Sequence, residues 1–466
     1  MDKGLLDREQ IKAVELAVLQ DKRSFRNGYS PQEDIRSILP EYGWKRTVAN
    51  TVFSALEEAA FLALEAQKLP HRLTGFAHYG LKEVSGKENL EVITEKEHTL
   101  ALLCTHESEA DYSLGHLLRH EGIPRGHTIA GSNLITNKKD GSYHGLLKLV
   151  FDADSILKLE RDLESIGVDR NRSSNYTLTF NRLFGQIHTM GGNTFGYPSG
   201  TRTRTNEDWG KIGDKKYFGM LLRAQEDSDK PIYAIPITVT YDRVFNASNL
   251  VGQNVTGIKK QDAEELSSLT LPLLKYSFFS PVYLHVGMPL NISEYLGTHG
   301  HQKRAQPALI QDFNEELIKG IYATPTSFAA SALKSFMPFD GSVADLAEEV
   351  KKTAEIMSDD PNTLRYSRIA VLSSMIAGND HVSQHDLVMA IHERLALAHA
   401  RGILMPAIIS HASASEVLKL AEKRGALLDF ARYDSERSEW SARDGMLTLY
   451  YAGAIDKRIE QALHST

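Results

Sequence analysis

A short apolar run that ends at a histidine constrains the fold of this chain more than any other feature of the sequence. The run Leu100-Ala101-Leu102-Leu103-Cys104 is continuous and hydrophobic, as in a buried strand, and a helix-like stretch follows over Ser113–His120. His106 and Asp111 lie five residues apart at this corner. In an ideal helix, five residues correspond to about 500° of rotation, so the two side chains would diverge by about 140° and need a turn to meet.

This histidine and carboxylate could form a reactive pair. A carboxylate on one imidazole nitrogen leaves the other nitrogen able to take a proton from a hydroxyl. The strand ends of α/β sheets are also the places where ligands bind. The alternative is that both residues are polar members of a surface turn, and the spacing alone does not decide between these interpretations.

Strand-like and helix-like stretches alternate between residues 73 and 300, which is typical of an α/β fold. The clearest predicted strands are Thr99–Thr105, Asn193–Tyr197, Ile232–Tyr241 and Val282–Val286. We predict a mixed, mostly parallel central sheet flanked by helices. Pro236 interrupts the third of these strands, so we expect that strand to be bulged or at an edge. The amphipathic stretch Leu146–Leu163 predicts a helix.

Helical patterns dominate both ends of the chain. We predict three domains: a helical N-terminal domain over residues 1–72, an α/β domain over 73–304, and a helical C-terminal domain over 305–466. The predicted helices at the two ends are Asp7–Gln20, Thr47–Lys68, Pro307–Ile318, Val343–Met357, Leu364–Ile376, Ser383–Leu395 and Ala414–Lys423. Met446–Tyr451 fits either a short strand or the start of a helix.

The composition excludes several classes of function. A net charge of -7 argues against a general nucleic-acid-binding chain. Cys104 is the single cysteine, so neither an intramolecular disulfide nor a cysteine-ligated metal site can form. No stretch has 18 uncharged apolar residues and the N-terminus lacks a secretory pattern, so we expect a cytoplasmic protein without a transmembrane helix.

Two arginine clusters suggest that the ligand carries a phosphate. Arg202 and Arg204 follow a Pro-Ser-Gly turn, where Gly200 permits a tight turn and a close approach of the backbone. Arg170 and Arg172 precede a predicted helix over Tyr176–His188. Guanidinium groups grip phosphates with two hydrogen bonds each. Solvated surface arginines are the alternative.

The order of these segments resembles the glycerolipid acyltransferases, and specifically the glycerol-3-phosphate 1-acyltransferases. The likeness extends from about residue 98 to residue 295. In chain order the segments are His-x4-Asp after a strand, Ile-Ala-Gly-Ser-Asn with the first arginine cluster, Pro-Ser-Gly-Thr-Arg-Thr-Arg-Thr, and Ile-Pro-Ile-Thr-Val-Thr-Tyr. Gly287-Met288-Pro289-Leu290 is similar to the closing strand of the family. Four ordered segments are far more specific than any one of them.

The resemblance implies a role for each segment. His106 would be the general base and Asp111 the carboxylate that holds it. The substrate phosphate would bind Arg202 and Arg204, with Arg170 and Arg172 doing similar work. The implied reaction transfers an acyl group from acyl-CoA or acyl-carrier protein to the 1-hydroxyl of glycerol 3-phosphate. It needs no cofactor or metal. The lipid product implies peripheral contact with a membrane surface.

The chain departs from the family at Ser199, where many members have glutamate. Two other functions stay open: an acyltransferase for dihydroxyacetone phosphate or lysophosphatidate, and a non-catalytic relative that binds lipid or a partner.

Four other features have their own alternatives. His116, His120 and His127 could ligate a metal, but the sequence has no His-Glu-x-x-His motif and we expect no metal. Cys104 could pair with His106 as a nucleophile, against which we favour core packing for a cysteine in an apolar strand. The helices Val343–Met357 and Ser383–Leu395 could form a helix-turn-helix, against which we favour a helical subdomain packed on the catalytic core. The stretch Ala49–Leu64 could form a surface helix for a membrane or a partner, against which we favour ordinary core packing.

Overall fold

The structure is a computed structural model, and it describes most of the chain. The described residues are 4–21, 29–39, 82–94, 97–107, 111, 118, 121–131, 157–159, 170–198, 215–244, 247–257, 281–378, 381–423 and 425–464. The predicted helix Thr47–Lys68, the surface stretch within it, and all of Ser113–His120 apart from Leu118 lie outside these residues.

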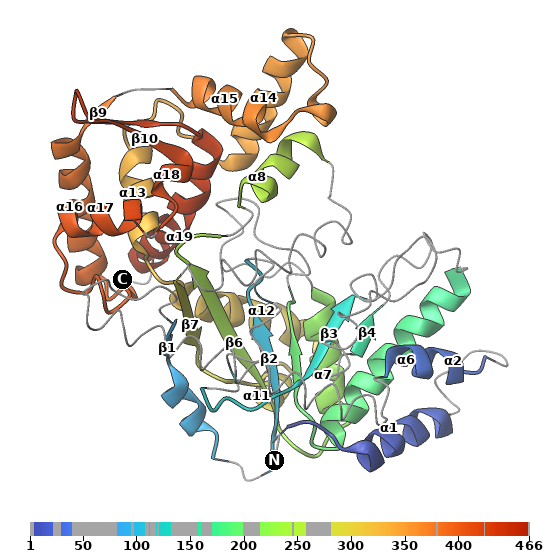
Figure 1. Ribbon diagram of the computed structural model, residues 1–466. Coiled ribbons are helices and arrows are strands. Elements are labelled where there is room, and N and C mark those ends of the chain that lie inside the picture. Colours follow the sequence, from blue (N-terminus) through green and yellow to red (C-terminus); the bar gives the residue numbers. More distant parts are fainter. Residues whose placement is uncertain are drawn as a thin grey trace, which may run out of the picture.

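The described part of the chain is built on an eight-stranded sheet (Figure 1). Its order is β1-β7-β6-β2-β5-β3-β4, and β8 pairs with β6 beside β7. The pairs are parallel except for β6 with β7 and β6 with β8. The strands are β1 (Lys82–Ser85), β2 (Thr99–Cys104), β3 (His127–Gly131), β4 (Leu157–Leu159), β5 (Thr194–Gly196), β6 (Ile232–Tyr241), β7 (Val282–Val286) and β8 (Leu290–Asn291). This arrangement confirms the predicted mixed, mostly parallel sheet.

Strands β2 and β6 form the centre of the sheet because both are predominantly apolar. They pair in parallel from Thr99 beside Ile232 to Cys104 beside Ile237, and every residue of both strands is buried. Parallel strands with helices on both faces are buried on both sides, so their sequences are continuous hydrophobic runs.

The prediction that Pro236 places its strand at an edge or in a bulge is wrong. β6 has β2 on one side, and on the other side it pairs with β8 and then with β7 from Ile237 onward. The carbonyl of Pro236 accepts from the N–H of Gly287 at 2.8 Å. The nitrogen and the carbonyl of one strand residue point to the same side, so the proline nitrogen also faces the connection between β7 and β8. No ladder partner faces the proline nitrogen at that connection, so the missing N–H of Pro236 removes no hydrogen bond from the sheet.

Helices cover both faces of the sheet, and each face has its own core. Side chains of β2 alternate between the two cores, with Leu102 on one side and Leu103 on the other. Leu103 packs with α1 (Arg8–Gln20), α2 (Gln32–Ile38), α6 (Arg170–Thr189), α7 (Lys215–Glu226), α11 (Ile292–His299) and α12 (Gln302–Lys319). The N-terminal helix α1 begins as predicted, with Asp7 and Gln10 forming a capping box.

The second core joins Leu102 to the C-terminal helices, which lie together beyond one end of the sheet (orange to red in Figure 1). The C-terminal helices are α13 (Pro325–Lys334), α14 (Val343–Ile356), α15 (Tyr366–Ala377), α16 (Gln384–Ala400), α17 (Ala414–Lys423), α18 (Leu427–Phe430) and α19 (Gly445–His464). Helix α8 (Ala247–Thr256), which follows β6 in the chain and is green in Figure 1, belongs to the same core. Short 3-10 turns occupy Lys87–Val92 and Pro361–Thr363. Met446–Tyr451 thus begins a helix. The expected boundary at residues 304 and 305 falls inside α12, and the division into three domains stays a prediction.

The structure differs from the predicted elements at three places: a second sheet, strand β4 and the start of α6. A small antiparallel sheet, β10-β11-β9, lies among the C-terminal helices and was not predicted; its strands are β9 (Val382–Ser383), β10 (Ala431–Asp434) and β11 (Glu439–Ala442). The predicted helix Leu146–Leu163 is wrong at Leu157–Leu159, which is strand β4 beside β3. The arginine cluster does not precede a helix, because α6 already begins at Arg170.

The helices of the suggested helix-turn-helix pack into the C-terminal core. α14 buries Val343, Leu346 and Val350 against α8, α15 and α19, while α16 packs on α13 and α17. Among the described residues, no helix is long and apolar enough to cross a membrane.

Candidate active site

The end of strand β2 sets the position of His106. The N–H of Thr105 donates to the carbonyl of Ile237 at 3.0 Å, which continues the pairing with β6 by one residue. The Thr105 hydroxyl accepts from the N–H of Val239 at 2.9 Å. The backbone is therefore fixed up to the residue before His106, at the carboxyl end of the central parallel strands.

The structure brings His106 and Asp111 together. The Nδ1 atom of His106 lies 2.8 Å from Oδ2 of Asp111. The same oxygen accepts the N–H of Glu107 at 2.7 Å, which closes the tight turn that the five-residue spacing requires. The carboxylate is fully buried, whereas 12% of the His106 side chain is exposed. A buried carboxylate thus holds an imidazole that a substrate can reach.

Two tyrosines also contact Asp111. The hydroxyl of Tyr241, at the end of β6, donates to Oδ1 at 2.6 Å. The hydroxyl of Tyr197, after β5, donates to the carbonyl oxygen of Asp111 at 2.5 Å, and its ring lies 4.7 Å from the His106 ring. Burial, and then the charge of Asp111, raise the pKa of Tyr241, so its hydroxyl stays a donor. Both carboxylate oxygens are therefore held by donors from separate parts of the chain.

This arrangement defines what the imidazole can do. An ionised carboxylate only accepts hydrogen bonds, so Nδ1 of His106 carries the proton and Nε2 of the neutral ring is an acceptor. The buried charge of Asp111 also stabilises the imidazolium that forms when Nε2 takes a proton. The pair is thus suited to act as a general base toward a hydroxyl or a water molecule.

Cys104 is not suited to act as a nucleophile with His106. Its side chain is fully buried in the core that includes Leu102 and Ile235. Burial raises the pKa of the thiol, and the charges of Asp111 and Glu107 raise it further. The thiolate is the reactive form of cysteine, so this residue contributes packing to β2.

The predicted phosphate-binding residues are only partly within the described residues. Arg170 and Arg172 lie in the first turn of α6, and only their backbone is described. Gly200, Arg202 and Arg204 lie outside the described residues. A role for these five residues in binding phosphate stays a prediction.

The histidines suggested as metal ligands do not form a cluster where they are described. His116 and His120 lie outside the described residues, and the buried His127 accepts the N–H of Leu6 at 3.0 Å through Nε2. Within the described ranges, no group of three metal-ligating side chains occurs.

Comparison with known proteins gives a distant structural match but no family assignment. No protein-family model matches the chain. The crystal structure of the 1-acyl-sn-glycerophosphate (LPA) acyltransferase PlsC from Thermotoga maritima superposes with a TM-score of 0.27 and 14% sequence identity, covering 56% of this chain and 81% of that one. With so low a TM-score, the match establishes neither a common fold nor a common activity.

Proposed function

We propose that this protein is a glycerol-3-phosphate 1-O-acyltransferase that uses acyl-CoA or acyl-carrier protein as the acyl donor. The observation that carries the proposal is the His106–Asp111 pair, held by Tyr241 at the carboxyl end of the central strands. The sequence resemblance to the glycerolipid acyltransferases supplies the substrate class.

The proposed reaction begins with proton transfer from the 1-hydroxyl of glycerol 3-phosphate to Nε2 of His106. The resulting alkoxide-like oxygen attacks the thioester carbonyl carbon and forms the new C–O bond. The C–S bond then breaks, and the imidazolium returns the proton to the departing thiolate. Asp111 keeps the ring oriented and stabilises its charge throughout. No cofactor or metal takes part in these steps.

In the proposed reaction, basic residues of two segments bind the negatively charged phosphate of the substrate. Arg202 and Arg204 would hold the phosphate beside Gly200, and Arg170 and Arg172 would add to the positive charge around it. The product, lysophosphatidate, is amphiphilic, so we propose that the protein works in the cytoplasm and contacts a membrane surface peripherally.

An acyl-transfer assay with glycerol 3-phosphate tests the proposal, run in parallel with an acyl-CoA and an acyl-carrier-protein donor. His106→Ala should lower kcat by about 10²–10⁴-fold, because that is the usual contribution of a general base. His411→Ala, at an exposed histidine on the helical side of the molecule, should leave kcat unchanged. Equal activity in the wild type and His106→Ala would show that His106 is not the general base, and no activity in the wild type would favour a relative that binds lipid or a partner without catalysis.

A panel of acyl acceptors tests the choice of substrate. Glycerol 3-phosphate should be preferred over dihydroxyacetone phosphate and lysophosphatidate, and a preference for either of these would assign the chain to a sister activity. Arg202→Ala should chiefly raise the KM for the acceptor, because it removes a contact with the phosphate rather than with the reacting hydroxyl. An unchanged KM would remove Arg202 from the phosphate site.

A further inference from the structure

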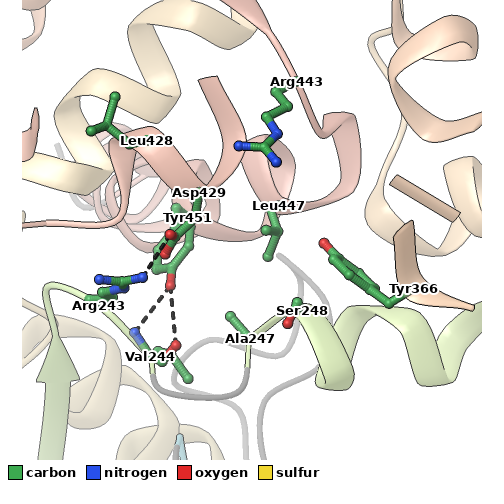
Figure 2. Close-up of a pocket in the computed structure, with 10 residues that line it drawn as sticks. All are labelled: Arg243, Val244, Ala247, Ser248, Tyr366, Leu428, Asp429, Arg443, Leu447 and Tyr451. Atoms are coloured by element: carbon green, nitrogen blue, oxygen red, sulfur yellow. Dashed lines mark hydrogen bonds and ion pairs between the residues drawn. The ribbon is translucent and has the colours of Figure 1, made fainter. Parts of the chain in front are cut away.

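A cavity of about 240 Å³ opens just beyond the end of β6, between α8 and the C-terminal helices α18 and α19 (Figure 2). Arg243 and Ser248 line it from the side of the sheet, and Asp429, Arg443 and Leu447 line it from the C-terminal helices. Arg443 reaches over it from the side opposite Ser248 (Figure 2). The mechanism proposed above uses none of these side chains.

The cavity has an excess of positive charge. The Nη2 atom of Arg243 lies 2.7 Å from Oδ1 of Asp429, so these two charges balance each other. The side chain of Arg443 is exposed and makes no hydrogen bond or ion pair with any residue in the described part of the chain. One cationic guanidinium is thus left to bind a further anion.

The walls of the cavity are fixed and partly apolar. The Tyr451 hydroxyl accepts the N–H of Val244 at 3.1 Å, which ties the end of β6 to α19. Tyr366 donates to Asp444, the residue before α19. Leu447 and Val244 supply apolar surface beside the charged groups. A ligand with an anionic end and an uncharged chain would match both kinds of surface.

Size and position narrow the class of ligand. Pockets that bind drug-sized ligands have volumes of about 300–1,000 Å³, so this smaller cavity suits a phosphate group and a short length of chain. Arg243 follows Tyr241 by two residues, and Tyr241 holds Asp111. The cavity therefore opens at the same edge of the sheet as His106.

We propose that this cavity binds the phosphate ester of the acyl donor, with Arg443 and Arg243 gripping the phosphate and the apolar wall receiving the chain attached to it. The choice of the donor as the source of the phosphate rests on the proposed function. Acyl-CoA and acylated carrier protein share this chemistry, because both carry a phosphate ester on the arm that ends in the thioester.

Calorimetric titration of the full chain with CoA, and separately with glycerol 3-phosphate, tests the inference without turnover. Arg443→Gln should raise the Kd for CoA at least tenfold. Asp429→Asn should lower it severalfold, because that change removes the carboxylate that competes with the phosphate for Arg243. Neither change should alter the Kd for glycerol 3-phosphate.

The matched control is Arg437→Gln, at an exposed arginine in the turn between β10 and β11, which should leave both Kd values unchanged. Far-UV circular dichroism verifies that each variant is folded. A change in the Kd for glycerol 3-phosphate alone would overturn the assignment to the donor, and equal CoA binding by the wild type and Arg443→Gln would overturn the site itself.

The CoA titrations and the acyl-transfer assay test the cavity site and the proposed reaction independently. CoA binding that depends on Arg443 supports the cavity site even if no acyl transfer to glycerol 3-phosphate occurs. Acyl transfer with CoA binding that is insensitive to Arg443 overturns the cavity site and leaves the proposed reaction in place.

Discussion

At the scale of single residues, Asp111 is the centre of the candidate site because its two carboxylate oxygens are held from two separate segments of the chain. His106 and the N–H of Glu107 hold one carboxylate oxygen, and Tyr241 holds the other. Leaving a buried polar group without its hydrogen-bond partner costs about 1–3 kcal/mol, and more for a charged group. The orientation of His106 is therefore sensitive to residues that never touch a substrate.

Removing the Tyr241 hydroxyl should reduce the acyl transfer that we propose. Tyr241→Phe should lower kcat about tenfold, equivalent to about 1.4 kcal/mol, with the acceptor KM unchanged. Steady-state kinetics with a saturating donor measure both constants. The matched control is Tyr217→Phe, at a buried tyrosine that packs in the core on the opposite face of the sheet. An equal loss of kcat in both variants would mean that Tyr241 acts only through packing.

A second residue, His188, should make stability depend on pH. It is fully buried between the hydroxyls of Thr99 at 3.0 Å and Thr194 at 3.2 Å, and burial lowers its pKa to about 3. An unfolded histidine titrates near pH 6.5, so between these values the unfolded state binds the additional proton. The contribution of His188 is then complete above about pH 6.5 and is lost as the pH falls toward 3.

Urea unfolding between pH 7.5 and pH 4.5 measures this dependence. The free energy of unfolding should decrease with falling pH by up to about 1.4 kcal/mol per pH unit from this residue. His188→Gln should be less stable at pH 7.5 and should show a shallower decrease. Identical slopes in the two proteins would show that other groups cause the dependence.

The sequence predicted the pair of His106 and Asp111 but neither of the two tyrosines that contact Asp111. His106 and Asp111 are five residues apart, so a local pattern contained both. Tyr197 and Tyr241 reach Asp111 from 86 and 130 residues away, and each sits in a β-like stretch where an aromatic residue is ordinary. Only the pairing of β2 with β5 and β6 brings these tyrosines to the histidine.

At the scale of elements, β6 is a central strand that contains a proline, Pro236, in its interior. The nitrogen of Pro236 faces the connection between β7 and β8, where it has no ladder partner. Pro236→Ala should destabilise the protein by about 1–3 kcal/mol, because the new N–H is buried without a ladder partner and the unfolded chain gains freedom. Pro361→Ala, at the start of a short 3-10 turn, should cost only about 0.4–1 kcal/mol. Thermal denaturation of both variants measures the difference.

Elements with a long and regular pattern were predicted from the sequence, whereas short ones were not. α17 was predicted at Ala414–Lys423 and β6 at Ile232–Tyr241, and the structure has both with these bounds. β4 has three residues and was placed inside a predicted helix, because a run so short has no periodicity of its own. The hairpin of β10 and β11 was missed because its turn, Ser435-Glu436-Arg437-Ser438, contains no glycine, proline or asparagine, although Ser438 adopts positive φ.

At the scale of the whole molecule, one continuous core joins the sheet to the C-terminal helices. It includes Leu102 and Ile235 of the sheet, Phe328 of α13 and Tyr450 of α19. Separating the sheet from these helices would expose the apolar surface of the shared core to water. We therefore expect them to unfold in a single transition.

Differential scanning calorimetry of the full chain measures this directly. Phe328→Ala, which empties a fully buried position in α13, should cost about 3–5 kcal/mol and lower the midpoint of the whole transition. Two resolved transitions, of which the substitution shifted only one, would show that the C-terminal helices fold independently of the sheet.

The single thiol of the molecule has a practical consequence. Cys104 lies in the central strand, two residues before His106, and its side chain has no exposed surface. An alkylating reagent can reach it only when β2 separates from its neighbours, so the labelling rate under native conditions reports the free energy of that local opening. Any ligand that binds at the adjacent corner should slow the labelling, which provides a binding assay that needs no knowledge of the reaction.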